Sequence, residues 1–151
     1  MDHRMYAANL FEQGYNCAQA VAVAFSDLTG LDEKASARII SAFGGGMGRM
    51  REVCGAVSGM LMVTSILYGY DDAQDTEGKK ALYQLVQDLA TQFREKGTGS
   101  IICRDILNDP SSDPTPSERT EEYYRLRPCA RMVYNAAEIL DDYIARHPVS
   151  K

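Results

Sequence analysis

Apolar residues recur at helical spacing through almost the whole chain, and this pattern constrains the fold more than any other feature of the sequence. No segment of four or more residues shows the alternation of apolar and polar side chains that a half-buried strand requires. The chain has 151 residues, about the size of one domain, and no linker or repeat divides it. We therefore predict an all-α fold, a compact helical bundle of about six to seven helices that forms one domain over residues 1–151.

Capping residues and glycines mark where these helices begin and end. Asp2, Asp32 and either Asp75 or Thr76 are expected N-caps, and Gly30 and Gly69 are expected to close helices. The expected helices span residues 2–13, 17–29, 32–43, 54–68, 75–96, 101–107 and 128–146.

Two of these helices have distinctive side-chain patterns. The 54–68 helix is apolar on nearly every side and is expected at the centre of the bundle. The 32–43 helix is expected to turn Ile39 and Ile40 inward. Between residues 108 and 117, three of the chain's five prolines predict an irregular surface loop before the last helix.

Charge and hydropathy exclude several classes of protein. Sixteen basic and 21 acidic residues give a net charge of −5, and no basic cluster suggests nucleic acid or an anionic membrane as a partner. The longest apolar run, residues 56–70, is interrupted by polar residues and is too short to cross a bilayer. The N-terminus lacks the features of an export signal. We expect a cytoplasmic protein with no membrane insertion, and we leave a homo-oligomer open.

Four cysteines are the strongest chemical signal: Cys17, Cys54, Cys103 and Cys129. In a reducing compartment, cysteines indicate metal binding or redox chemistry rather than a permanent disulfide framework. Each follows a glycine or proline break and lies inward in the first turn of an expected helix, where the helix dipole favours thiolate over thiol. We predict that the four sulfur atoms converge at one end of the bundle and form the catalytic or metal-binding site.

Three interpretations of these cysteines stay open. They bind an iron–sulfur cluster or another metal, or they cycle between dithiol and disulfide. Alternatively they are small core residues, since free cysteine is often buried, and the protein is a non-catalytic helical interaction module whose proline-containing loop contacts a partner.

The glycine-rich segment 43–59 also requires an explanation. It lacks the lysine of a phosphate-binding loop and does not follow a strand, so it does not predict nucleotide binding. Its glycines either form a turn with positive φ and let two helices approach closely, or expose backbone N–H groups to a thiolate or cofactor. The second interpretation assigns cofactor binding to Gly46, Gly48 and Gly55, with Arg49 and Arg51 supplying charge.

Other titratable residues predict no second site. His3 and His147 lie at opposite ends of the chain, which gives no support to a catalytic triad or an HExxH zinc site. Asp141 and Asp142 are expected to be solvated charges at a helix end.

Cys17, the sequence Cys-Gly-Ala-Val-Ser-Gly at residues 54–59, Cys103 and Cys129 together resemble the C_GCAxxG_C_C family, which is named for this pattern. The resemblance extends over residues 16–133. It implies a redox-active protein without an assigned substrate, and a redox partner linked to a transporter, because members are often encoded near transporter genes. A domain that looks related is present in a multihaem cytochrome with an iron–sulfur centre, and this resemblance favours a metal.

Overall fold

The computed structural model describes residues 2–149. Apart from one isolated β-bridge, all regular secondary structure in this range is helical. Its elements are α1 (His3–Glu12), α2 (Cys17–Ala24), α3 (Ser26–Thr29), α4 (Glu33–Ile40), the 3-10 helix η1 (Ser41–Phe43), α5 (Gly44–Met47), α6 (Gly55–Tyr68), α7 (Thr76–Lys96), α8 (Cys103–Leu107), α9 (Glu121–Leu126) and α10 (Cys129–Arg146). Six of these described helices have eight residues or more, which confirms the predicted all-α bundle. None of them is both long enough and apolar enough to cross a bilayer.

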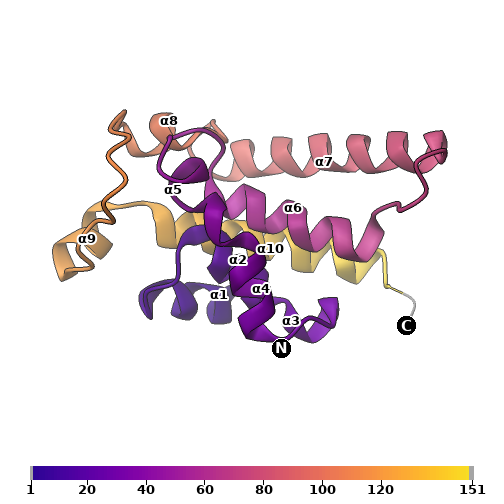
Figure 1. Cartoon of the computed structure of the whole chain (residues 1–151), viewed down its shortest axis with the longest axis horizontal. Helices are drawn as coiled ribbons and strands as arrows, with labels where there is room; N and C mark the ends of the chain where they lie inside the picture. Colours follow the sequence, from indigo (N-terminus) through magenta and orange to yellow (C-terminus); the bar gives the residue numbers. More distant parts are fainter. Residues whose placement is uncertain (1, 150–151) are drawn as a thin grey trace.

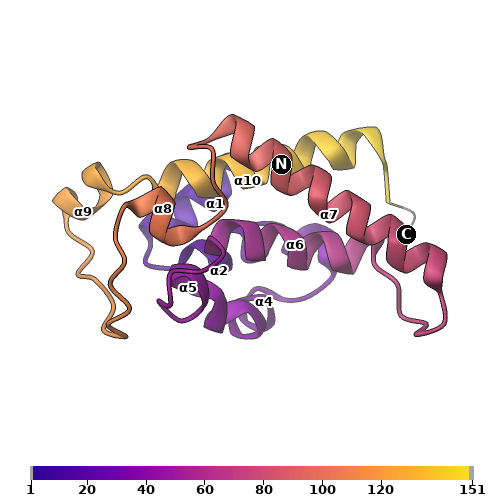
Figure 2. The same ribbon diagram turned by 90° about the horizontal axis from the view of Figure 1, so that it is seen from above.

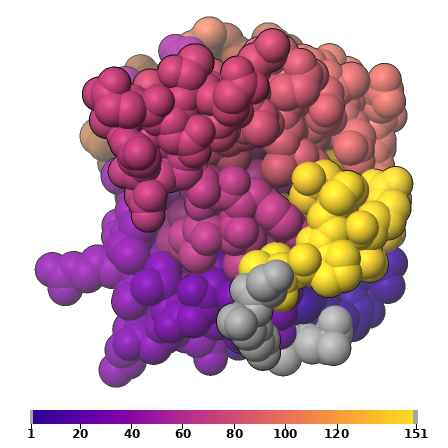
Figure 3. Space-filling view, turned by 90° about the vertical axis from the view of Figure 1, so that its right-hand side faces the viewer, coloured from indigo at the N-terminus to yellow at the C-terminus, as the bar shows by residue number. Residues whose placement is uncertain are grey.

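The three longest helices pack against one another, and each contacts the other two. Helices α6 and α10 run in the same direction and α7 runs back along them, as the colours of Figures 1 and 2 show. Helix α2 packs against α1, α4, α6 and α10, and six of its eight residues are buried. The start of α7 and the ends of α6 and α10 lie at one end of the molecule, which Figure 3 shows in space-filling form. The other end holds α5, α8 and α9.

Helices α2 and α6 approach each other closely because α6 carries glycine at the contact. A Cβ atom on Gly59 would lie 2.6 Å from the carbonyl oxygen of Ala18, and one on Gly55 would lie 3.0 Å from the Ala18 nitrogen. Any larger side chain at Gly59 would push the two helices apart. The packing interpretation of these two glycines is therefore confirmed.

Capping predicts the helix starts well, but three details of the fold differ from expectation. The 17–29 helix breaks at Phe25 into α2 and α3. In α4 the buried face carries Ser36 and Ile40, while Ile39 is 57% exposed, because α4 packs on α2 through its Ile40 side. Helix α9 was not expected.

A buried histidine joins the two ends of the chain. His3 is 6% exposed; its Nδ1 lies 2.6 Å from Asp141 Oδ1 and its Nε2 lies 3.0 Å from Asp27 Oδ1. Its ring also stacks on Phe25. The expectation that Asp141 is a solvated charge is therefore wrong, because α1 packs along α10 and brings the histidine onto this carboxylate.

Candidate functional site

All four cysteines lie at helix N-termini. Cys17, Cys103 and Cys129 are the first residues of α2, α8 and α10, and Cys54 is the N-cap residue of α6. All four are free thiols. They line one cavity of about 270 Å³ at the end of the bundle where these helices begin. The structure thus brings together the cysteines that the sequence singles out, while their catalytic or metal-binding roles stay predictions.

Cys54 and Cys103 are placed by a short backbone pairing. The Cys54 N–H donates to the carbonyl oxygen of Ile101 at 2.7 Å, and the Cys103 N–H donates to that of Glu52 at 2.6 Å. An isolated antiparallel bridge forms at this point. The pairing fixes the starts of α6 and α8 side by side, and nothing in the side-chain pattern of either segment predicts it.

The thiols of Cys17 and Cys129 form the second pair of the site. The hydrogen bond between them raises the pKa of Cys17 well above its usual value and lowers the pKa of Cys129. Burial opposes the shift at Cys129, whereas the guanidinium groups of Arg127 and Arg119 add to it. The proton is therefore held on Cys17, and Cys129 is the sulfur of this pair that ionises first.

The other two cysteines have the opposite tendency. Burial raises the pKa of Cys54 to about 12, although the backbone amides of Ala56 and Val57 act to lower it. Burial also raises the pKa of Cys103, against the effect of Arg51, whose Nη1 lies 3.6 Å from the Cys103 sulfur. The expectation that every helix N-terminus favours thiolate is therefore wrong for three cysteines, because desolvation or a thiol hydrogen bond outweighs the helix dipole.

The glycine-rich segment forms a left-handed turn against this site. Residues 45–49 all have positive φ, and Arg51 does as well. Non-glycine residues in this conformation cost about 1–2 kcal/mol each, so Met47 and Arg49 hold strained backbone beside the cavity. At Gly46, a Cβ atom would lie 2.6 Å from the Cβ atom of Cys103. Glycine is thus required there both by φ and by contact.

The glycines predicted to bind a cofactor, Gly46, Gly48 and Gly55, all line the cavity. The close contacts at Gly46 and Gly55 account for glycine at those two positions without a cofactor. A role of the three backbones in binding a cofactor stays a prediction.

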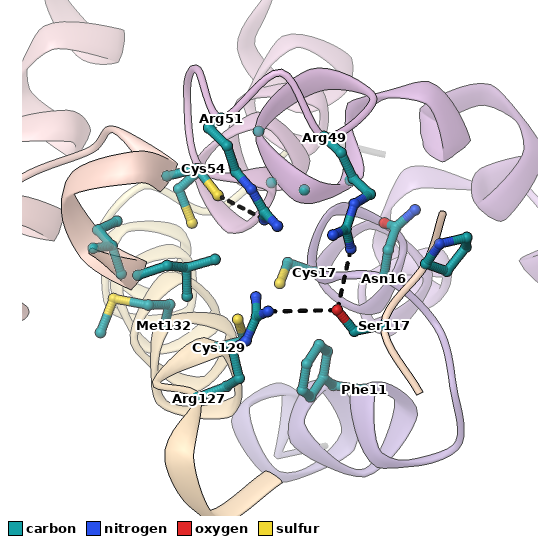
Figure 4. A pocket seen from close by; sticks show the side chains of 18 of the residues that line it. Phe11, Asn16, Cys17, Arg49, Arg51, Cys54, Ser117, Arg127, Cys129 and Met132 are labelled. Atoms are coloured by element: carbon teal, nitrogen blue, oxygen red, sulfur yellow. Dashed lines mark hydrogen bonds between the residues drawn. The ribbon is translucent and has the colours of Figure 1, made fainter. Parts of the chain in front are cut away.

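Four arginines line the cavity: Arg49, Arg51, Arg119 and Arg127. Figure 4 shows the guanidinium groups of Arg49, Arg51 and Arg127 directed toward the space beside the Cys17 and Cys129 sulfur atoms. The sequence indicates charge from Arg49 and Arg51 at this site but gives no such indication for Arg119. The position of Arg127 two residues before Cys129 was the only signal for its proximity.

Three of these arginines hold the proline-containing loop over the cavity. Arg49 Nε donates to the carbonyl oxygen of Asp113 at 2.7 Å, and Arg51 Nε donates to that of Ser111 at 2.9 Å. Ser117 on the same loop accepts from Arg49 at 3.3 Å and from Arg127 at 3.4 Å. The loop predicted from its prolines therefore forms a wall of the site, with Pro114 and Pro116 among the lining residues.

The thiols supply the donor type of an iron–sulfur or zinc site. Within residues 2–149, however, no three His, Cys, Asp or Glu side chains are grouped closely enough to hold one metal ion. The predicted metal centre therefore stays a prediction.

The fold and the cavity define an all-α protein with four free thiols at one site. A sequence profile of the family described as "Putative redox-active protein (C_GCAxxG_C_C)" matches residues 15–143, a segment that contains all four cysteines. The chain belongs to this family, and the resemblance inferred from its motifs is confirmed. No curated protein and no solved structure gives a significant match.

Proposed function

We propose that this protein is a thiol-based redox protein in which Cys17 and Cys129 cycle between dithiol and disulfide. The proposal is carried by two free thiols from separate helices that line the same cavity and shift each other's pKa in opposite directions. Helices α2 and α10 pack together, so this pairing is part of the fold and does not depend on a loop closing.

The two sulfurs take different parts in the reaction. Cys129 ionises first and is the nucleophile, because Cys17 donates to it and Arg127 lies nearby. After Cys129 bonds to an oxidised substrate, Cys17 loses its proton and attacks the Cys129 sulfur. The disulfide forms, and the substrate leaves with two electrons more than it brought. Cys17 is therefore the resolving cysteine.

Cys54 and Cys103 are the other two cysteines of the same site. Their thiols stay protonated at neutral pH, because burial raises the pKa of both. They take part by exchange with the Cys17–Cys129 disulfide, in which a thiolate must first form. The proposal also includes a reducing, cytoplasmic location, where the resting state is the dithiol, and a separate redox partner.

A metal centre is the second candidate. Four thiols and four guanidinium groups around one cavity suit an anionic iron–sulfur cluster, whose protein ligands are cysteine thiolates. The same four cysteines would hold it, and it would supply one-electron transfer when bound. Protein purified without oxygen would then absorb broadly at visible wavelengths and would contain iron.

Thiol counting tests the dithiol proposal. The reduced protein is treated with diamide, and free thiols are titrated under denaturing conditions before and after. We expect the loss of two thiols, restored by dithiothreitol, in the unaltered chain and in Cys54→Ser. The loss should disappear in Cys17→Ser and in Cys129→Ser. A colourless, metal-free protein that loses no thiols would contradict both candidates and leave the cysteines as packing residues of an interaction module.

A further inference from the structure

The cavity contains a buried cation with an unused donor. Arg51 is 2% exposed; its Nε donates to Ser111 and its Nη1 contacts the Cys103 sulfur. Within residues 2–149 its Nη2 makes no hydrogen bond; it forms only an ion pair with Asp109 Oδ2 at 3.6 Å, and the same oxygen lies 3.8 Å from Arg127 Nη2. Buried donors are almost always paired, and a guanidinium pairs best with the oxygens of an anion.

The charges around the cavity also favour an anion. Two carboxylates lie beside the four lining arginines: Asp109, near Arg51 and Arg127, and Asp113, near Arg49. The difference, four cations against two anions, leaves two positive charges in excess. This local excess stands in a chain whose net charge is −5. A cavity with such a field concentrates anions, most strongly those with two negative charges.

The cavity has room for an anion beside the arginines. Its volume of about 270 Å³ is several times the roughly 30 Å³ that one water molecule occupies in the liquid. The proline-containing loop, held by Arg49 and Arg51, closes one side. Arg127 brings the third guanidinium group to the space beside Cys129, as Figure 4 shows. A small oxyanion fits this space.

We propose that the cavity binds a small tetrahedral oxyanion between Arg51 and Arg127, and that such an oxyanion is the oxidant of the Cys17–Cys129 dithiol. The claim that the cavity binds an oxyanion depends only on the arginines. The claim that this oxyanion oxidises the dithiol rests on the proposed function. Arg51 and Arg127 hold the anion's oxygens, so that its central atom faces the Cys129 sulfur.

The reaction balances without a further oxidant. The Cys129 thiolate bonds to the central atom, and one anion oxygen leaves as water with two protons, one from Cys17 and one from the solvent that took up the Cys129 proton. The Cys17 sulfur then bonds to the Cys129 sulfur, and the bond from Cys129 to the central atom breaks, leaving its electron pair on that atom. The products are a disulfide, one water and an anion with one oxygen fewer. Two sulfurs lose two electrons in total, and the central atom gains two.

Phosphate binding tests the first half, because phosphate has the required shape and charge and thiols do not reduce it. Calorimetry on the reduced protein should show saturable binding of inorganic phosphate. The dissociation constant should rise about tenfold or more in Arg51→Met and Arg127→Gln, since each loses charge-assisted hydrogen bonds. It should stay unchanged in Arg125→Gln, an exposed arginine on α9.

Circular dichroism shows whether each variant is folded. If Arg51→Met does not fold, the phosphate affinity of Arg127→Gln decides the result. No phosphate binding, or equal binding in Arg127→Gln and Arg125→Gln, would overturn the site.

Arsenate tests the second half, since it matches phosphate in shape and can be reduced. The reduced protein should convert arsenate to arsenite with the loss of two thiols, and phosphate should inhibit this reaction competitively. If arsenate competes with phosphate but consumes no thiols, while diamide still forms the disulfide, the oxyanion is not the oxidant and the proposed function stands. If diamide also fails while phosphate still binds, the proposed function fails and the anion site stands.

Discussion

Cys17 and Cys129 begin two helices that are remote in the sequence, and their thiols line one cavity, where each shifts the pKa of the other in the opposite direction. The pair is part of the helix packing, because α2 lies against α10 in the core. A thiol that donates to its neighbour makes that neighbour the better nucleophile. The functional asymmetry of the site therefore follows from the contact of these two residues.

Alkylation should show this asymmetry directly. Cys129 should react with iodoacetamide at lower pH than Cys54, because the pKa of Cys129 lies below its ordinary value and that of Cys54 is about 12. Cys17→Ala removes the hydrogen bond and should shift the Cys129 reaction profile to higher pH. Arg127→Gln should shift it the same way. The measurement is the rate of labelling of each cysteine by mass spectrometry across a pH series.

Arg131→Gln is the matched control for this series, because Arg131 lies on α10 but is exposed and stacks on Tyr134. Its Cys129 profile should match that of the unaltered chain. If Cys17→Ala does not shift the pH dependence of Cys129 alkylation, the contact with Cys17 does not set the pKa of Cys129.

Alkaline pH should destabilise the fold through Cys54. In the unfolded chain this thiol ionises near its ordinary pKa of 9.0, whereas in the folded protein it keeps its proton up to about 12. Between these values the unfolded state binds fewer protons, so the free energy of unfolding should fall as the pH rises, by roughly 1 kcal/mol per pH unit. Urea unfolding of the unaltered chain and of Cys54→Ala at pH 8, 9 and 10 isolates this contribution. Equal slopes in the two proteins would argue against it.

The contact between α2 and α6 should discriminate between two glycines. Gly59→Ala should lower the free energy of unfolding by about 1–3 kcal/mol, because its Cβ would lie 2.6 Å from backbone. Gly55→Ala should cost less, since its nearest contact is 3.0 Å, and the helix-forming tendency of alanine offsets part of the cost.

Ser58→Ala, at a half-buried position on the same helix, is the control and should stay near neutral. Chemical denaturation gives all three values. A Gly59→Ala variant as stable as Ser58→Ala would show that α6 can move away from α2 at little cost.

His3 should make the stability depend on pH near neutrality. Burial lowers its pKa, but the hydrogen bonds to Asp141 and Asp27 outweigh burial, and the net shift is upward from 6.5. A raised pKa in the folded state means that the charged histidine stabilises the fold below pH 6.5, and that this contribution is lost as the pH rises through the folded pKa. His3→Gln should therefore cost about 1.5–3 kcal/mol at pH 5.5 and less at pH 8.5. Thermal or urea unfolding at both pH values measures the cost of His3→Gln. An equal cost at pH 5.5 and pH 8.5 would show that His3 is neutral at both pH values and would contradict the prediction.

The sequence predicts those features of the site that depend on local chemistry. Asp2, Asp32 and Asp75 each place a helix start correctly, because an N-cap side chain acts within three residues of its own position. Glycine and proline breaks likewise place the four cysteines at helix N-termini. Periodicity fails at Ile39, where a contact with another helix decides which side of α4 is buried.

The features that the sequence does not predict all depend on distant segments meeting. The pairing that joins Cys54 to Cys103 uses backbone groups and leaves no side-chain pattern. From the sequence, Asp141 is expected to be a surface charge, but in the fold α1 places His3 within hydrogen-bond distance of it. The direction of each thiol's pKa shift depends on burial and on the neighbouring thiol or guanidinium, which exist only in the folded protein.

The most direct test of the thiol pair is to map the disulfide that mild oxidation forms. Reduced protein is treated with a small excess of diamide, remaining thiols are blocked, and proteolytic peptides are identified by mass spectrometry without reduction. The account predicts one major crosslinked peptide pair, which joins Cys17 to Cys129 and disappears on treatment with dithiothreitol. A first disulfide between Cys54 and Cys103, or no disulfide in a folded protein, would contradict it.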